Sequence, residues 1–84
     1  MRPDIVYILR SQSQPHRWYT GLTSDVQARV AAHNRGESNH TATGRPWTLV
    51  ASIEFASTRT AKAFEAYLKS GSGRAFAERH FRGE

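Results

Sequence analysis

The fold is decided by a short run near the N-terminus, DIVYILR at residues 4–10, in which β-branched and aromatic side chains crowd together. Such residues favour strands, and a nearly continuous hydrophobic run is typical of a central strand that is covered on both faces. A polar connection punctuated by Pro15 leads to a second run, RWYTGL at residues 17–22. The two runs therefore predict a β-hairpin with a rather long loop.

A helix and a third strand are predicted downstream of this hairpin. Residues 23–25, Thr-Ser-Asp, offer N-cap side chains to a helix that runs from Val26 to Asn34. Residues 37–46 are rich in Ser, Asn, Thr and Gly, which predicts a polar loop. The run WTLVASIEF at residues 47–55 then predicts the third strand.

Two more helices are predicted in the last third of the chain. Ser57 and Thr58 can cap a helix over residues 59–69, and the sequence SGSG at residues 70–73 is expected to break it. The buried stripe of this helix is expected to contain Ala61, Phe64 and Leu68. A short last helix over residues 74–81 is expected to be anchored by Phe76 and Phe81. The order ββαβαα predicts an α/β (α+β) fold, with an antiparallel or mixed sheet flanked by helices.

Composition narrows the class of protein. We expect one small domain over residues 1–84, and the absence of cysteine excludes disulfides, thiolate zinc sites and cysteine nucleophiles. Ten Arg and two Lys against seven acidic residues give a net charge of +5, which favours nucleic acid as a partner. Scattered basic residues argue against a membrane surface, and residues 1–4 do not resemble a signal peptide, so a cytoplasmic location is expected.

A spread set of five residues could carry chemistry: Tyr7, Tyr19, Arg29, His33 and Glu65. Arg29 and His33 are four residues apart and share a helix face, while the two tyrosines lie on paired strands. These residue types are the groups that phosphodiester hydrolysis requires. An Arg can bind phosphate, a His can carry a proton, a Tyr can orient water and a carboxylate can hold a metal ion. The alternative for each residue is structural: a half-buried strand Tyr, or a Glu65 that simply pairs with Lys69.

At these residues the sequence strongly resembles the GIY-YIG nuclease domain, and the resemblance covers nearly the whole chain. The first signature triplet appears as Ile5-Val6-Tyr7 and the second as Tyr19-Thr20-Gly21. Arg29, His33 and Glu65 match the family's functional helix positions. The chain looks most like the small stand-alone bacterial members, which are similar to the catalytic domain of structure-selective nucleases. It departs from the pattern at Ile5, Val6 and Thr20, none of which performs chemistry in the family's scheme.

The resemblance implies a three-stranded antiparallel sheet flanked by helices, and hydrolysis with a single divalent ion, Mg²⁺ or Mn²⁺, held by Glu65. In that scheme Tyr7 activates or orients the attacking water and His33 relays the proton. Tyr19 helps position water or phosphate, and Arg29 stabilises charge on the phosphoryl oxygens. The division of labour between the two tyrosines stays open.

We therefore expect a metal-dependent endonuclease that acts on DNA. Branched or damaged DNA is the substrate class considered, and such a substrate implies a role in DNA repair. The residues expected to contact nucleic acid are Arg17, Trp18, Arg35, His40, Arg45 and Trp47. The alternatives are a nucleic-acid-binding module with weak or lost catalysis, or a subunit that needs a partner protein for substrate choice. RNA as a substrate and a homodimer are both left open.

Overall fold

Seven elements follow one another in residues 4–81, the part of the chain that the computed structural model describes. They are β1 (Ile5–Ser11), β2 (Trp18–Thr23), α1 (Val26–Asn34), the 3₁₀ turn η1 (Ala42–Gly44), β3 (Trp47–Glu54), α2 (Thr58–Leu68) and α3 (Gly71–His80). The predicted order ββαβαα is confirmed, and η1 lies within the segment that was expected to be irregular. Residues 1–3, on which the signal-peptide argument drew, lie outside the described residues.

The sheet has three antiparallel strands in the order β2-β1-β3, so the alternative of a mixed sheet is excluded. β1 is the central strand, as its hydrophobic run predicted. Tyr7 is paired with Gly21 and Leu9 with Tyr19 across the β1–β2 ladder. On the other side, the register between β1 and β3 shifts between Ile8 and Leu9.

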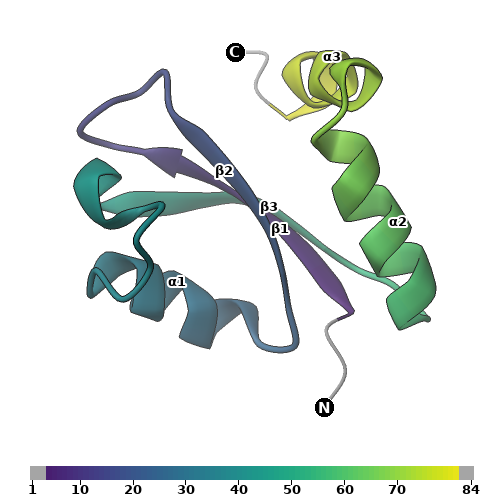
Figure 1. Cartoon of the computed structure of the whole chain (residues 1–84), viewed down its shortest axis with the longest axis horizontal. Coiled ribbons are helices and arrows are strands. Elements are labelled where there is room, and N and C mark those ends of the chain that lie inside the picture. The colour runs from purple at the N-terminus through teal and green to yellow at the C-terminus, as the bar shows by residue number, and fades with distance from the viewer. Residues whose placement is uncertain (1–3, 82–84) are drawn as a thin grey trace.

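Each face of the sheet is covered by helices (Figure 1). Val6 and Ile8 of β1 pack against Ala61, Leu68 and Ala77, which belong to α2 and α3. The alternate residues Tyr7 and Leu9 pack on the opposite face, with Trp47, Tyr19, Val26 and Val30 around them. We call these the α2–α3 face and the α1 face of the sheet. All four of these β1 side chains are at most 1% exposed, which the two-sided burial of a central strand explains.

The prediction for residues 70–73 was wrong in part. α2 does end before this segment, but α3 begins at Gly71 rather than Arg74. Ser70 is the N-cap, and its hydroxyl accepts a hydrogen bond from the backbone N–H of Gly73. A Cβ at Gly73 would overlap the backbone carbonyl of Tyr67, so the missing side chain lets the two helices approach closely.

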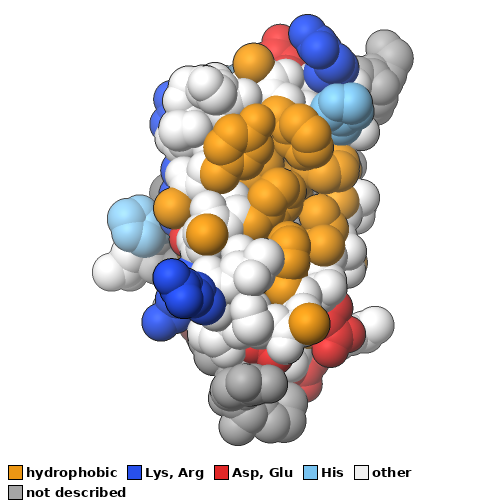
Figure 2. Space-filling model, turned by 90° about the vertical axis from the view of Figure 1, so that its right-hand side faces the viewer, with side chains coloured by type: hydrophobic (Ala, Val, Ile, Leu, Met, Phe, Trp, Pro, Cys, Tyr) orange, Lys and Arg blue, Asp and Glu red, His pale blue; other side chains and the backbone are white. Residues whose placement is uncertain are grey.

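Aromatic side chains form much of the outer layer over α2 and α3. Phe64 contacts Phe55, Tyr67 and Phe76 through its ring, and Phe76 in turn contacts Phe81. Figure 2 looks at this side of the molecule and shows hydrophobic side chains gathered there. Among residues 4–81, no helix has the length and apolar character needed to cross a bilayer.

Candidate active site

Helix α1 carries two of the predicted site residues toward the sheet. Asp25 caps the helix by accepting a hydrogen bond from the Ala28 N–H, which fixes where the helix begins and hence which residues face inward. Arg29 and His33 are one turn apart, and the Arg29 Nη2 atom lies 3.5 Å from Nε2 of His33. His33 is fully buried and Arg29 is partly exposed.

His33 is held between two hydroxyl groups. Its Nε2 atom lies 2.8 Å from the Tyr7 hydroxyl, and its Nδ1 atom lies 2.6 Å from Oγ1 of Thr41. Because a guanidinium can only donate, the approach of Arg29 indicates an unprotonated Nε2 that accepts hydrogen bonds. Nδ1 then carries the proton and donates to Thr41, so that Nε2 is the nitrogen at which the imidazole can take up a second proton.

The two tyrosines are diagonal neighbours on the α1 face, because the register pairs Tyr7 with Gly21 and Tyr19 with Leu9. Their ring centroids are 6.1 Å apart, and the ring of Tyr19 meets that of His33 edge-on at 4.9 Å. Gly21 makes this arrangement possible, since a Cβ there would overlap the Tyr7 phenol. The sheet and α1 therefore bring Tyr7, Tyr19, Arg29 and His33 together.

Burial and mutual contacts shift the pKa values of three residues of this cluster. Burial raises the pKa of Tyr7, and the nearby Arg29 only partly offsets this effect, so Tyr7 stays a neutral phenol at neutral pH. Burial also lowers the pKa of His33, and the positive charge of Arg29 lowers it further. The pKa of Arg29 is raised, chiefly by its hydrogen bond to Tyr7. The cluster is thus a neutral phenol and a neutral imidazole beside a permanent cation.

Burial separates the two tyrosines in a way that sequence reasoning did not. Tyr7 is 0% exposed, so its hydroxyl has no direct contact with solvent. Tyr19 is partly exposed and lines a surface pocket. Of the two tyrosines Tyr19 is therefore the one at the surface, and the role of Tyr7 toward the attacking water stays a prediction.

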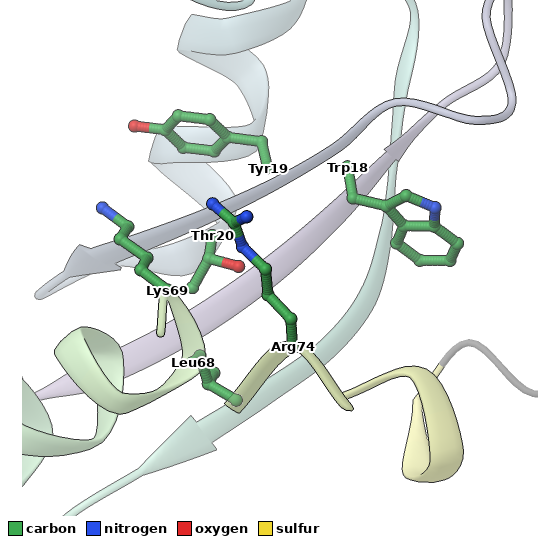
Figure 3. A pocket seen from close by; sticks show the side chains of 6 residues that line it. All are labelled: Trp18, Tyr19, Thr20, Leu68, Lys69 and Arg74. Atoms are coloured by element: carbon green, nitrogen blue, oxygen red, sulfur yellow. The ribbon is translucent and has the colours of Figure 1, made fainter. Parts of the chain in front are cut away.

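Glu65 lies apart from this cluster, on α2 and so on the other face of the sheet. Its Oε2 atom forms an ion pair with Nζ of Lys69 at 2.6 Å, as the structural alternative predicted. The two halves approach at the open edge of β2, where a pocket of about 280 Å³ contains both Tyr19 and Lys69. We call it the β2-edge pocket, and Figure 3 shows its six lining residues: Trp18, Tyr19, Thr20, Leu68, Lys69 and Arg74.

The donor set allows one kind of metal site. Residues 4–81 contain no group of three or more His, Cys, Asp or Glu side chains that could enclose an ion. Glu65 offers a hard carboxylate whose side chain is 21% exposed. Mg²⁺ keeps several waters and is commonly bound by one or two carboxylates together with substrate phosphates. A single partly exposed carboxylate fits that mode, with Lys69 as a competing cation.

The residues that were expected to contact nucleic acid are placed very differently from one another. Trp47 is 4% exposed and its indole N–H donates to the Thr41 carbonyl, so its ring packs in the core and offers no stacking face. Arg17 bonds to Thr43 Oγ1 and to the His40 carbonyl, and its guanidinium lies over the Trp47 ring. Trp47 and Arg17 thus hold the 37–46 loop against the sheet.

Trp18, Arg35, His40 and Arg45 keep a surface position. Trp18 is partly exposed in the β2-edge pocket, with the Arg10 guanidinium 5.1 Å from its ring centroid. Arg35 is exposed and paired with Glu37 at 2.6 Å, and Arg45 is exposed with its Nε bonded to the Ala42 carbonyl. His40 is exposed as well, although its carbonyl is used by Arg17.

Thr41 was missed by sequence reasoning, although it holds the one nitrogen of His33 that faces away from Tyr7. It is 0% exposed, and its carbonyl accepts hydrogen bonds from the Trp47 indole and the Gly44 N–H. In the sequence it is one hydroxyl residue in a polar loop, and nothing local distinguishes it from its neighbours.

The chain is similar to known proteins over most of its length. The family model described as the GIY-YIG catalytic domain matches residues 3–79. The chain is 37% identical over 73 residues to a UPF0213 protein of Staphylococcus haemolyticus, covering 86% of this chain and 87% of that protein. It is 39% identical over 70 residues to a UPF0213 protein of Halalkalibacterium halodurans, covering 82% and 72% respectively. No solved structure gives a significant match.

Proposed function

Because the chain belongs to the GIY-YIG family of nuclease domains, we propose that it is a metal-dependent endonuclease that hydrolyses phosphodiester bonds in DNA. The observation that carries this proposal is the hydrogen-bonded series Tyr7–His33–Thr41, with Arg29 at 3.5 Å from the same imidazole. An imidazole that is neutral at neutral pH can accept a proton, and the adjacent guanidinium can stabilise negative charge that develops nearby.

In the proposed reaction Tyr19 contacts and orients the attacking water, because it is the phenol that reaches the surface. Tyr19 lies beside both Tyr7 and His33, with ring centroids 6.1 and 4.9 Å away, and Tyr7 donates to Nε2 of His33. A proton leaving the water can therefore pass through the two phenols to the imidazole, without either phenol persisting as an anion. Thr41 holds the tautomer in which Nε2 accepts that proton.

Arg29 acts on the phosphate. Its guanidinium is partly exposed, lies beside both phenols, and carries a charge that its raised pKa makes permanent. It is therefore suited to bind a phosphoryl oxygen and to stabilise the charge that develops on it. Glu65 would hold a divalent ion such as Mg²⁺ or Mn²⁺, which when bound supplies positive charge beside the phosphoryl group.

The experiment is a cleavage assay with the full chain on flaps, junctions, duplex and single-stranded DNA, in Mg²⁺ and in EDTA. We expect nicked product that depends on Mg²⁺ and is greatest on branched DNA, which would fit a role in DNA repair. Binding that is steeply salt-dependent but gives no product on any substrate would replace the nuclease by a nucleic-acid-binding module.

A further inference from the structure

We propose that the β2-edge pocket binds a second phosphate of the nucleic-acid strand that is cut, near the bond to be cut. Arg74 and Lys69 are the residues of the pocket that bind this anion. The inference rests on the proposed function, since it names a second contact of the same substrate. It extends the site beyond the residues that the family's signature triplets and helix positions mark.

The chemistry of the pocket selects an anion. Its six lining residues include two cations and no carboxylate, together with the hydroxyl group of Thr20. Lys69 and Arg74 are both exposed at its rim. A guanidinium fork can bind two phosphate oxygens at once, and an ammonium group adds a point charge. Both side chains extend toward β2 from the junction of α2 and α3 (Figure 3).

The position of the pocket makes a nucleic-acid strand the fitting source of that anion. Tyr19 belongs both to the pocket and to the cluster around His33, where its ring lies 4.9 Å from the imidazole. Lys69 belongs to the pocket and contacts Glu65 at 2.6 Å. The pocket is therefore contiguous with both halves of the candidate active site. A strand with one phosphate at Arg29 can follow the edge of β2 and present another of its phosphates to Arg74.

The junction that carries the two cations is tightly constructed. The Ser70 hydroxyl caps α3 and also donates to the Tyr67 carbonyl, so one side chain ties the end of α2 to the start of α3. Gly73 packs its backbone against Tyr67 and Leu68. Lys69 and Arg74 flank this turn, and their spacing is fixed by it. Unlike the exposed Arg59, Lys62 and Arg79 on the same helices, both of these residues line the pocket.

The test is the affinity of the full chain for a fluorescent branched DNA, measured by anisotropy in EDTA over a series of salt concentrations. Arg74→Gln is compared with Arg79→Gln, which removes the same charge from the same helix outside the pocket. We expect Arg74→Gln to raise Kd roughly five- to tenfold and to reduce the salt slope by about one, with Arg79→Gln close to wild type. Thermal melting of each variant checks that the fold is retained.

The outcomes separate this inference from the proposed function. Equal affinities for Arg74→Gln and Arg79→Gln, or no DNA binding by the wild type at low salt, would overturn the pocket as a phosphate site. Cleavage by the wild type in Mg²⁺ would in that case leave the nuclease proposal standing. If Arg74→Gln selectively weakens DNA binding and the wild type never cleaves DNA, the phosphate site in the pocket is supported and the nuclease proposal is contradicted.

Discussion

The Tyr7 hydroxyl lies 2.8 Å from Nε2 of His33, although the two residues are 26 positions apart in the sequence. Both side chains are fully buried, and Thr41 holds the other nitrogen of the imidazole. Burying a phenol and an imidazole is costly unless their polar atoms are paired, and here each of these atoms has a partner. The pair thus links the stability of the fold to the protonation state of His33.

Thr41→Val tests the support of His33. The substitution keeps the shape of the side chain but removes the oxygen that accepts from Nδ1, leaving a buried donor unpaired. We expect a loss of about 1–3 kcal/mol in the free energy of unfolding, measured by urea denaturation. Thr41→Val should also change the His33 tautomer, whereas Thr41→Ser keeps the hydroxyl and should retain the wild-type tautomer. NMR of the His33 ring nitrogens measures the tautomer. An equal tautomer change in both variants would contradict a positioning role for the hydroxyl.

The lowered pKa of His33 predicts how stability depends on pH. As pH falls below the ordinary value of about 6.5, the unfolded chain binds a proton at this residue before the folded chain does. The free energy of unfolding should therefore decrease with falling pH, by up to about 1.4 kcal/mol per unit, until the lower folded-state pKa is passed. Urea denaturation between pH 7 and 4 measures this slope.

His33→Gln is the reference for that experiment, because the other three histidines stay in place. Below pH 6.5 the unfolding free energy of this variant should depend less on pH than that of the wild type, because the contribution of His33 is missing. This comparison of slopes does not depend on the absolute stability of the variant. A slope identical to that of the wild type would show that burial of His33 does not control the pH dependence.

Arg29→Gln separates the electrostatic role of Arg29 from its contact with substrate. Removing the cation should raise the pKa of His33 toward its ordinary value, because the charge of Arg29 is one cause of the shift. NMR titration of the His33 ring measures this change without substrate. In the cleavage assay the same variant should lose about 100-fold or more in kcat, as loss of a charge-stabilising donor does. An unchanged His33 titration would contradict the proposed coupling.

The fold was largely predictable because its elements are encoded locally. The hydrophobic run of β1, the caps of α1 and the stripe of α2 all lie within short windows of sequence. The start of α3 was misjudged because glycine usually ends helices. Here Gly73 is required by a tertiary contact with Tyr67, which no local pattern reveals.

Gly73→Ala and Gly71→Ala test this reading of the α2–α3 junction. A methyl group at Gly73 would overlap the Tyr67 carbonyl and force the helices apart, which should cost about 1–3 kcal/mol in unfolding free energy. A methyl group at Gly71 meets nothing within 4 Å, and should be neutral or stabilising by up to about 1 kcal/mol. Equal thermal stability of the two variants would contradict the close packing at Gly73.

The site was predictable in its residue types and less so in its geometry. Helical spacing placed Arg29 and His33 on one face, but only the register could show that Tyr7 is enclosed while Tyr19 reaches the surface. The burial of Trp47 and the bond from Thr41 to His33 depend on how the 37–46 loop folds back over α1. That path is set by long-range contacts, which a single polar loop sequence does not encode.

Cleavage of a branched DNA by Glu65→Gln, measured beside wild type and Glu78→Gln, is the most direct test of a metal-dependent nuclease in which Glu65 holds the metal. Glu78 is an exposed carboxylate on α3 outside the β2-edge pocket, so its substitution controls for the change in charge. We expect Mg²⁺-dependent product from wild type and Glu78→Gln, and none from a folded Glu65→Gln protein that still binds DNA. Product formed by Glu65→Gln at the wild-type rate, in protein free of contaminating nuclease, would contradict it.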